Sequence, residues 1–303
     1  MSKFKKGGKK SVGSISTASL PDIVFMLLFF FMVTTVMREV DLKVDLTAPT
    51  ASEVKKLEDK GVKQDHIIIS SGIGCHGKIF DYIGLSGLYS IHGRSMATVQ
   101  GMKLGNPDLK VIAFAGDGDA YGEGIAHMIF AAKRNADITV IVHNNGAYAL
   151  TTGQFSPTSK KGFKGPSRPE GNIEDPINPL SLLLEAGASF VARGYSAKMD
   201  HLSDLIVEAV MHEGFSVIDV LQPSVVFNNT YKLYNEKTEI VQKPAKSFDE
   251  AVKLVKDMKE RMPIGVFYNV KKPVFHKELM GDWNPVQNKM SRNERLKKIN
   301  KYV

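Results

Sequence analysis

Cysteine is nearly absent from this sequence, with one residue among 303. A single cysteine excludes an internal disulfide, which agrees with a reducing compartment. It also excludes a [4Fe–4S] cluster held by this chain alone, because such a cluster ordinarily takes four cysteine thiolates. Internal repeats are absent too, and the one biased stretch is the short Lys- and Gly-rich start, so repeat architectures are excluded.

The chain also lacks a motif for nucleic-acid recognition, although its net charge is +8. Its basic residues gather at the amino terminus, at 160–168 and at 289–301. None of these clusters has the interleaved aromatic residues of a nucleic-acid surface. We therefore expect no nucleic-acid partner. A solvated surface, a membrane-facing tail and a docking face for an acidic protein remain as alternatives.

A long apolar run is present near the amino terminus. Residues 15–37 contain one charge, Asp22, and residues 23–33 are all apolar. A helix needs roughly 20 such residues to cross a bilayer, so we predict a transmembrane helix at about 15–37, with the preceding lysines in the cytoplasm. A cleaved signal peptide is disfavoured because no small-x-small site follows Val33. A buried core helix is disfavoured because the run has no amphipathic stripe.

Asp22 lies at the edge of this predicted helix. A carboxylate within a membrane span is costly and usually marks an ion or proton pathway. Alternatively, Pro21 and Asp22 form the first turn of the helix, where a negative charge is favourable. The sequence leaves both interpretations open.

The most informative motif is Gly116-Asp117-Gly118, followed after 25 residues (119–143) by Asn144-Asn145. Residues 111–115 and 138–142 are short apolar runs typical of buried parallel strands, and residues 125–134 between them are predicted to form a helix. In such a strand–loop–helix–strand unit, both motifs follow the carboxyl ends of strands, where α/β sheets bind ligands.

The residue types at these strand ends suit a metal bound to a diphosphate. Mg²⁺ takes oxygen ligands in near-octahedral geometry. The Asp117 carboxylate, the Asn145 side-chain carbonyl, a backbone carbonyl near Ala147 and two phosphate oxygens would nearly fill that shell, and flanking glycines let phosphates approach the backbone. The alternative is an ordinary strand–loop–helix with a chance aspartate.

The remaining pattern predicts an α/β fold, a parallel sheet with helices on both faces. The further helices are expected at 180–188, 201–212 and 248–261, the last strand of the sheet at 216–221, and a long functional loop at 155–180. The regions are expected to be 1–62 (basic amino terminus, transmembrane helix and linker), 63–232 (ligand-binding domain) and 233–303 (helical extension and basic tail).

The middle of the chain resembles the β subunit of 2-oxoacid:ferredoxin oxidoreductases, which bind thiamine diphosphate. The motifs that carry the resemblance are Ser71-Gly72-Ile73-Gly74-Cys75, His92-Gly93-Arg94, Lys103-Leu104-Gly105-Asn106-Pro107-Asp108, Gly116-Asp117-Gly118-Asp119, Tyr148-Ala149-Leu150-Thr151-Thr152-Gly153-Gln154 and Ser156-Pro157-Thr158. Weaker matches extend it over most of residues 64–303. It implies Mg²⁺ and thiamine diphosphate, a partner α subunit, and oxidative decarboxylation of a 2-oxoacid to acyl-CoA, with ferredoxin as electron acceptor.

The resemblance also implies roles for single residues. The cofactor-binding positions are Gly74, Cys75, His92, Gly93, Arg94, Gly116, Asp117, Gly118, Asp119, Asn145, Ala147 and Tyr148. Asp117, Asn145 and Ala147 would hold the metal. His92 and Arg94 would lie near the cofactor, or else form a structural hydrogen-bonded pair. The family's activating glutamate comes from the α subunit, so no catalytic residue is assigned in this chain.

The chain departs from this family at its cysteines. The family's Cys-Pro-x-Cys-Gly motif is absent, and Ser224 stands in the place of a later cluster cysteine. Cys75 aligns with a cluster ligand but is expected here to be a buried free thiol. We therefore predict no [4Fe–4S] cluster in this chain.

The amino-terminal part resembles a different family. Residues 16–35, Ser-Thr-Ala-Ser-Leu-Pro-Asp-Ile-Val-Phe-Met-Leu-Leu-Phe-Phe-Phe-Met-Val-Thr-Thr, are similar to ExbD/TolR biopolymer-transport proteins, in which the aspartate matching Asp22 carries protons. The resemblance ends near Lys60. It implies, as the alternative function, a proton-driven transport subunit in the inner membrane, whereas the enzyme body would be cytoplasmic. A chimaeric or mis-joined chain is the favoured explanation of the two parts.

Overall fold

The computed structural model describes residues 52–256 and 261–300. The predicted transmembrane helix at 15–37 and Asp22 lie outside these residues. Among the helices within them, none has the length and apolar character needed to cross a membrane.

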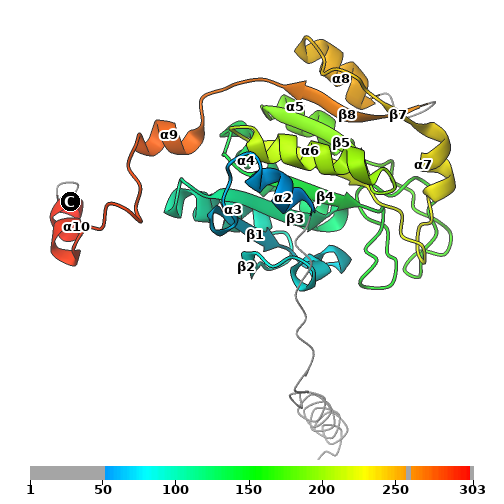
Figure 1. The fold of residues 1–303 in the computed structure, drawn as a ribbon. Helices are drawn as coiled ribbons and strands as arrows, with labels where there is room; N and C mark the ends of the chain where they lie inside the picture. The colour runs from blue at the N-terminus through cyan, green and yellow to red at the C-terminus, as the bar shows by residue number, and fades with distance from the viewer. Residues whose placement is uncertain (1–51, 257–260, 301–303) are drawn as a thin grey trace, which may run out of the picture. The chain divides into compact units, whose positions relative to one another are not determined.

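A mostly parallel sheet forms the centre of the described chain (Figure 1). Its strands are β1 (Ile67–Ser71), β2 (Ser86–Tyr89), β3 (Lys110–Gly116), β4 (Thr139–Asn144), β5 (Phe190–Tyr195), β6 (Ser216–Leu221), β7 (Thr238–Ile240) and β8 (Met262–Asn269). Their order across the sheet is β2-β1-β3-β4-β6-β5-β8-β7. Neighbouring strands run parallel except β5 and β8, which are antiparallel.

Two expectations about this sheet need correction. The strand at 216–221 is found as β6, but it lies between β4 and β5 and is not the last of the sheet. The segment after residue 232 was expected to be helical, yet it contributes β7 and β8, and β8 hydrogen-bonds to β5. Strand order depends on which distant segments pair, and local apolar patterning carries little information about it.

Helices cover both faces of the sheet, as the sequence predicts. The described helices are α2 (Ser52–Glu58), α3 (Ser95–Gly105), α4 (Ile125–Lys133), α5 (Pro179–Glu185), α6 (Met199–Met211), α7 (Tyr231–Lys237), α8 (Phe248–Lys256), α9 (Phe275–Met280) and α10 (Arg292–Ile299). One apolar cluster joins α3, α4, α5 and α8 to one face, and a second joins α2 and α6 to the other.

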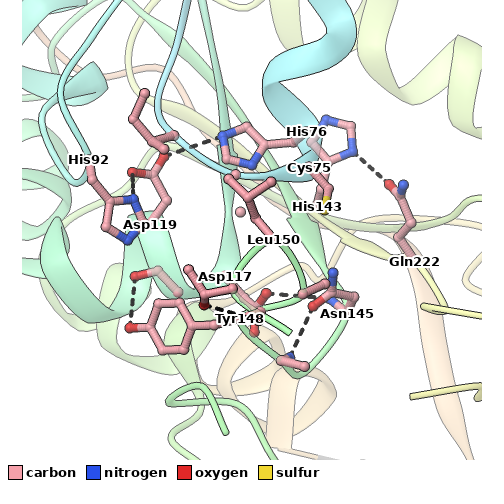
Figure 2. A pocket seen from close by; sticks show the side chains of 17 residues that line it. Cys75, His76, His92, Asp117, Asp119, His143, Asn145, Tyr148, Leu150 and Gln222 are labelled. Carbon is pink, nitrogen blue, oxygen red and sulfur yellow. Dashed lines mark hydrogen bonds and ion pairs between the residues drawn. The ribbon is translucent and has the colours of Figure 1, made fainter. Parts of the chain in front are cut away.

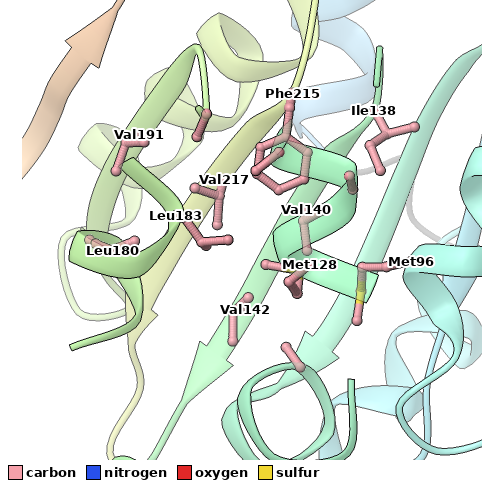
Figure 3. Close-up of a cluster of buried hydrophobic side chains, with 14 of the residues drawn as sticks. Met96, Met128, Ile138, Val140, Val142, Leu180, Leu183, Val191, Phe215 and Val217 are labelled. Atoms are coloured by element: carbon pink, nitrogen blue, oxygen red, sulfur yellow. The ribbon is translucent and has the colours of Figure 1, made fainter. Parts of the chain in front are cut away.

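The two apolar clusters arise from alternation along buried strands. On β3, Val111 and Ala113 belong to the first cluster, whereas Ile112 and Phe114 belong to the second. Figure 3 shows part of the first cluster, where Val140 and Val217 lie near side chains of α4 and α5. A strand buried on both faces is apolar throughout, which is why these segments were recognisable as strands.

Three irregular segments lie at the carboxyl ends of these strands. A 3-10 helix (Cys75–Asp81) follows β1, and a short π-helical turn (Gly118–Glu123) follows β3. The third, residues 145–178 between β4 and α5, includes the long loop that the sequence predicts. These segments supply most residues of the candidate functional site.

Candidate functional site

Asp117 and Asn145 meet at one edge of the sheet. Gly116, at the end of β3, pairs in register with His143 of the neighbouring strand β4. Asp117 and Asn145 therefore leave adjacent parallel strands at the same edge, and the Asn145 backbone N–H lies 3.4 Å from Asp117 Oδ1. The predicted juxtaposition of the two motifs is present.

The Asp117 carboxylate is held in one orientation. It is 1% exposed, and its Oδ2 accepts hydrogen bonds from Ser156 Oγ (2.5 Å) and Thr158 Oγ1 (2.6 Å). Burial raises the pKa of Asp117, and these hydroxyl bonds partly oppose the rise. Oδ1 receives the longer contact from the Asn145 N–H, at 3.4 Å, so it is the oxygen better placed to bind a cation.

The turn after β4 orients the Asn145 oxygens. The side-chain Oδ1 accepts the Ala147 N–H at 2.9 Å, and the backbone carbonyl of Asn145 accepts Asn228 Nδ2 at 2.7 Å. Gly146 between them has φ of 65°, a conformation that favours glycine. Asn145 Oδ1 keeps a second lone pair for a metal.

The oxygen atoms of Asp117 and Asn145 suit a hard cation whose remaining ligands come from water or from a bound molecule. Carboxylate and amide oxygens are ligands that Mg²⁺ prefers, and it completes its shell with water or phosphate oxygens. Within the described ranges, no group of three or more His, Cys, Asp or Glu side chains could hold a metal. A metal beside Asp117 and Asn145 would therefore need further oxygens from the backbone, from water or from a ligand.

A pocket opens beside these two residues (Figure 2). The expected site residues that line it are Gly74, Cys75, His92, Gly116, Asp117, Gly118, Asp119, Asn145, Ala147 and Tyr148. Unforeseen lining residues include His76, His143, Leu150 and Gln222. His76 and His143 each adjoin a motif, but nothing else in the sequence indicates that they line a pocket. Gln222 directly follows β6, far from the motifs in sequence.

Two expected site residues, Gly93 and Arg94, do not line the pocket. The Gly93 N–H donates to Asp119 Oδ1 at 2.5 Å, and the exposed Arg94 guanidinium donates to the backbone carbonyls of Gly93 and Glu123 at 3.2 Å. The hydrogen bonds of Arg94 thus go to backbone carbonyls and not to His92. His92 lines the pocket, with Nδ1 3.0 Å from Asp119 Oδ1.

Asp119 is buried between two histidines. Its Oδ1 faces His92, and its Oδ2 lies 3.5 Å from Nε2 of His76, whose side chain is 3% exposed. A Cβ added to Gly72 would lie 1.9 Å from Asp119 Oδ2. The glycine after β1 is therefore needed so that the Asp119 carboxylate can fit against the backbone.

Gly118 lines the pocket and also packs against a pocket side chain. A Cβ on Gly118 would lie 2.2 Å from Cε1 of Tyr148, so this glycine makes room for the tyrosine ring. Burial, with the nearby carboxylate of Glu123 and others, raises the pKa of Tyr148 to about 12. Gly116 faces the pocket more directly, and a Cβ there would lie 3.0 Å from His76 Nδ1.

His143 and Cys75 occupy the side of the pocket nearest Gln222. His143 Nδ1 lies 2.6 Å from Gln222 Oε1, and burial lowers the pKa of His143 to about 4, so its ring is neutral at physiological pH. Cys75 was expected to be buried, but it is exposed. It follows the β1 strand end at the start of a 3-10 helix, which carries the thiol to the pocket rim.

Comparison with protein families identifies three regions. The thiamine pyrophosphate enzyme, C-terminal TPP-binding domain, matches residues 72–220, and the C-terminal domain of the pyruvate ferredoxin oxidoreductase β subunit matches residues 225–281. The biopolymer transport protein ExbD/TolR family matches residues 8–80. The last part of that match, residues 67–80, lies in β1 and the following 3-10 helix of the α/β fold.

Individual proteins agree with the first two matches. The chain is 43% identical over 235 residues to a 2-oxoacid:ferredoxin oxidoreductase subunit β of Saccharolobus solfataricus, covering 72% of this chain and 77% of the relative. It is 42% identical over 216 residues to 2-oxoacid:ferredoxin oxidoreductase 1, subunit β, of Aeropyrum pernix, covering 66% and 68%. A structure of 2-oxoglutarate:ferredoxin oxidoreductase from Magnetococcus marinus, with 2-oxoglutarate, coenzyme A and succinyl-CoA bound, superposes with a TM-score of 0.73 at 27% identity, covering 80% and 84%.

Proposed function

Because the chain belongs to the family of 2-oxoacid:ferredoxin oxidoreductase β subunits, we propose that it holds Mg²⁺ and thiamine diphosphate in the pocket at the ends of β3 and β4. The observation that carries the proposal is the pairing of Asp117 and Asn145, with Asp117 Oδ2 fixed by two hydroxyls and Oδ1 left for a cation. Asp117, Asn145 and the carbonyl of Ala147 are the proposed metal ligands.

The proposed reaction is oxidative decarboxylation of a 2-oxoacid to acyl-CoA, with ferredoxin as electron acceptor. Bound thiamine diphosphate supplies the carbanion chemistry, and the protein supplies position and electrostatics. In this chain, Asp119 lies beside His92 and His76 at one wall of the pocket, and the neutral His143 contacts Gln222 at another. The partner α subunit is expected to supply the activating glutamate, so turnover requires both subunits.

The cysteine content of this chain does not fit an iron–sulfur cluster. Cys75 is the only one in the sequence, and position 224 carries serine. Since such a cluster ordinarily takes four thiolates, we propose that this chain by itself does not bind one.

Calorimetry of thiamine diphosphate binding, with and without Mg²⁺, tests the proposed site. We expect Mg²⁺-dependent binding by the full chain in mild detergent, and loss of more than about 100-fold in affinity in Asp117→Asn, which removes the charge from a ligand. Asp200→Asn, at the exposed start of α6, is the matched control and is expected to bind normally.

The lone exposed cysteine adds a second, local measurement. Cys75 lines the pocket, so bound thiamine diphosphate is expected to slow its reaction with a thiol reagent in the parent chain but not in Asp117→Asn. Binding without Cys75 protection would place the ligand elsewhere. Absence of Mg²⁺-dependent binding in the parent chain would overturn the proposed function.

For the amino-terminal part, we propose a membrane anchor of the ExbD/TolR type. The family match at residues 8–80 and the apolar run at 15–37 support it. A Phe29→Lys, Phe30→Lys double variant is expected to move the chain from the membrane to the soluble fraction, since each central charge opposes insertion by about 3 kcal/mol. Unchanged fractionation of the double variant would contradict the membrane anchor. Asp22→Asn leaves the apolar run intact and tests proton-driven transport separately.

A further inference from the structure

We propose that Asp219, with Arg193 as its buried counter-cation, is a positioning residue for the metal–diphosphate site. It lies on β6, outside the pocket lining. The inference rests on the proposed function, because it concerns the affinity of that same site. In this proposal, Asp219 holds two site-bearing segments at a set spacing and orientation. These segments are the turn after Asp117 and the end of β4, and they adjoin the proposed metal ligands.

Asp219 and Arg193 form a buried charge pair between neighbouring strands. They are partners in register on β6 and β5, each is 2% exposed, and Arg193 Nε lies 3.5 Å from Asp219 Oδ2. The guanidinium also donates to the Pro263 carbonyl at 3.4 Å and lies over the Phe267 ring. Burying two charges is costly, and replacing such pairs with apolar residues is often neutral or stabilising, so stability alone gives a poor reason for this pair.

The second oxygen of Asp219 contacts both site-bearing segments. Asp219 Oδ1 accepts the Tyr121 hydroxyl at 3.1 Å and the Asn144 Nδ2 at 3.0 Å. Tyr121 belongs to the π-helical turn that begins directly after Asp117, and Asn144 directly precedes Asn145. One carboxylate oxygen therefore links the segments that follow β3 and β4.

The charge of Asp219 also decides which way the Asn144 amide faces. An ionised carboxylate only accepts hydrogen bonds, so Asn144 must present its NH₂ group to Asp219. Its carbonyl oxygen then faces Thr158 Oγ1 at 2.9 Å, and the same hydroxyl lies 2.6 Å from Asp117 Oδ2. The Thr158 hydroxyl has one hydrogen, so it donates either to Asn144 Oδ1 or to Asp117 Oδ2. Through this shared hydroxyl, polar contacts run from Arg193 and Asp219 to the proposed metal ligand.

Asp219→Asn tests this assignment with almost no change in shape. Arg193 still requires an oxygen acceptor, so the new amide is expected to turn its NH₂ toward Asn144 and Tyr121. The Asn144 NH₂ then faces a hydrogen-bond donor where it previously faced an acceptor. Residues that orient metal ligands through hydrogen bonds typically contribute 10–100-fold to metal affinity. We therefore expect the Mg²⁺ concentration for half-maximal thiamine diphosphate binding to rise about 10-fold, measured by calorimetry on folded chain.

A second buried ion pair provides the matched control. Lys103 and Asp137 lie 2.7 Å apart with side chains 7% and 12% exposed, and Asp137 precedes β4, at the opposite end of that strand from Asn144. Asp137→Asn should lower stability while leaving the Mg²⁺ requirement unchanged. A purely structural role for Asp219 predicts that both variants behave alike, so equal Mg²⁺ curves for the two would overturn the proposal.

A double-mutant cycle tests the route through Asn144. If Asp219 acts by orienting Asn144, Asp219→Asn should have little further effect in an Asn144→Ala background, so the two changes are strongly non-additive. Additive effects would refute this route. If Asp219→Asn does not fold, Asn144→Ala and Tyr121→Phe still report on the two links, and normal Mg²⁺ curves in both would overturn the inference.

The two proposals fail in distinguishable ways. If the parent chain does not bind thiamine diphosphate with Mg²⁺, the proposed function fails. If the parent binds and Asp219→Asn binds identically, only the positioning role fails.

Discussion

Individual glycines in this chain differ in what a side chain would meet. At Gly72, an added Cβ would lie 1.9 Å from the buried Asp119 carboxylate, whereas at the exposed Gly101, within α3, no atom lies within 4 Å. Gly72→Ala should lower the free energy of unfolding by about 1–3 kcal/mol through overpacking. Gly101→Ala should raise it by about 0.5–1 kcal/mol, because alanine loses less backbone entropy in a helix. Urea unfolding of both variants measures the difference, and a Gly72→Ala chain as stable as the parent would contradict the packing at Asp119.

Residues such as Ser156 and Thr158 show the limit of prediction at this scale. Their motif was noted for its family resemblance, yet nothing in it indicated that both hydroxyls bind the Asp117 carboxylate. The Cys75 thiol was expected to be buried and is exposed. Burial and hydrogen-bond partners are set by the whole packed structure, so residue type alone predicts them poorly.

At the scale of elements, strands and helices with strong periodicity were recognisable one by one. The strand at 216–221 and the helix at 125–134 agree closely with β6 and α4. On the helix predicted at 248–261, α8 is described from Phe248 to Lys256, and Ala251 and Val255 are buried as its amphipathic pattern indicates. The position of β6 inside the sheet and the antiparallel addition of β8 depend on pairing between distant segments, which element-level patterns do not encode.

At the scale of the whole molecule, several partly or fully buried histidines make stability depend on pH. Burial lowers the pKa of His143 to about 4, and it also lowers the pKa of His201, His212 and His276. Between about pH 6.5 and 4 the unfolded chain binds protons that the folded chain does not, so stability falls as pH falls. Over this range His143 contributes a slope of up to roughly 1.4 kcal/mol per pH unit.

Urea unfolding without Mg²⁺ or cofactor, at pH values from 7.5 to 5, checks this dependence. The free energy of unfolding should fall toward pH 5, and His143→Gln, which keeps a polar partner for Gln222, should reduce the slope. A slope that is the same in His143→Gln as in the parent chain would show that His143 does not carry the effect.

The sequence by itself determined that Asp117 and Asn145 would meet. A strand–loop–helix–strand unit is local, and parallel strands present their carboxyl ends at one edge, so the spacing of the two motifs sufficed. Only the tertiary structure decided which side chains surround these two residues. Ser156 and Thr158 belong to the long loop and hydrogen-bond to Asp117. Asp219 and Arg193 lie on β6 and β5 and form a buried ion pair. Such partners are far apart in sequence and come together only once the sheet has assembled, because hydrogen bonds between distant side chains depend on strand order and register.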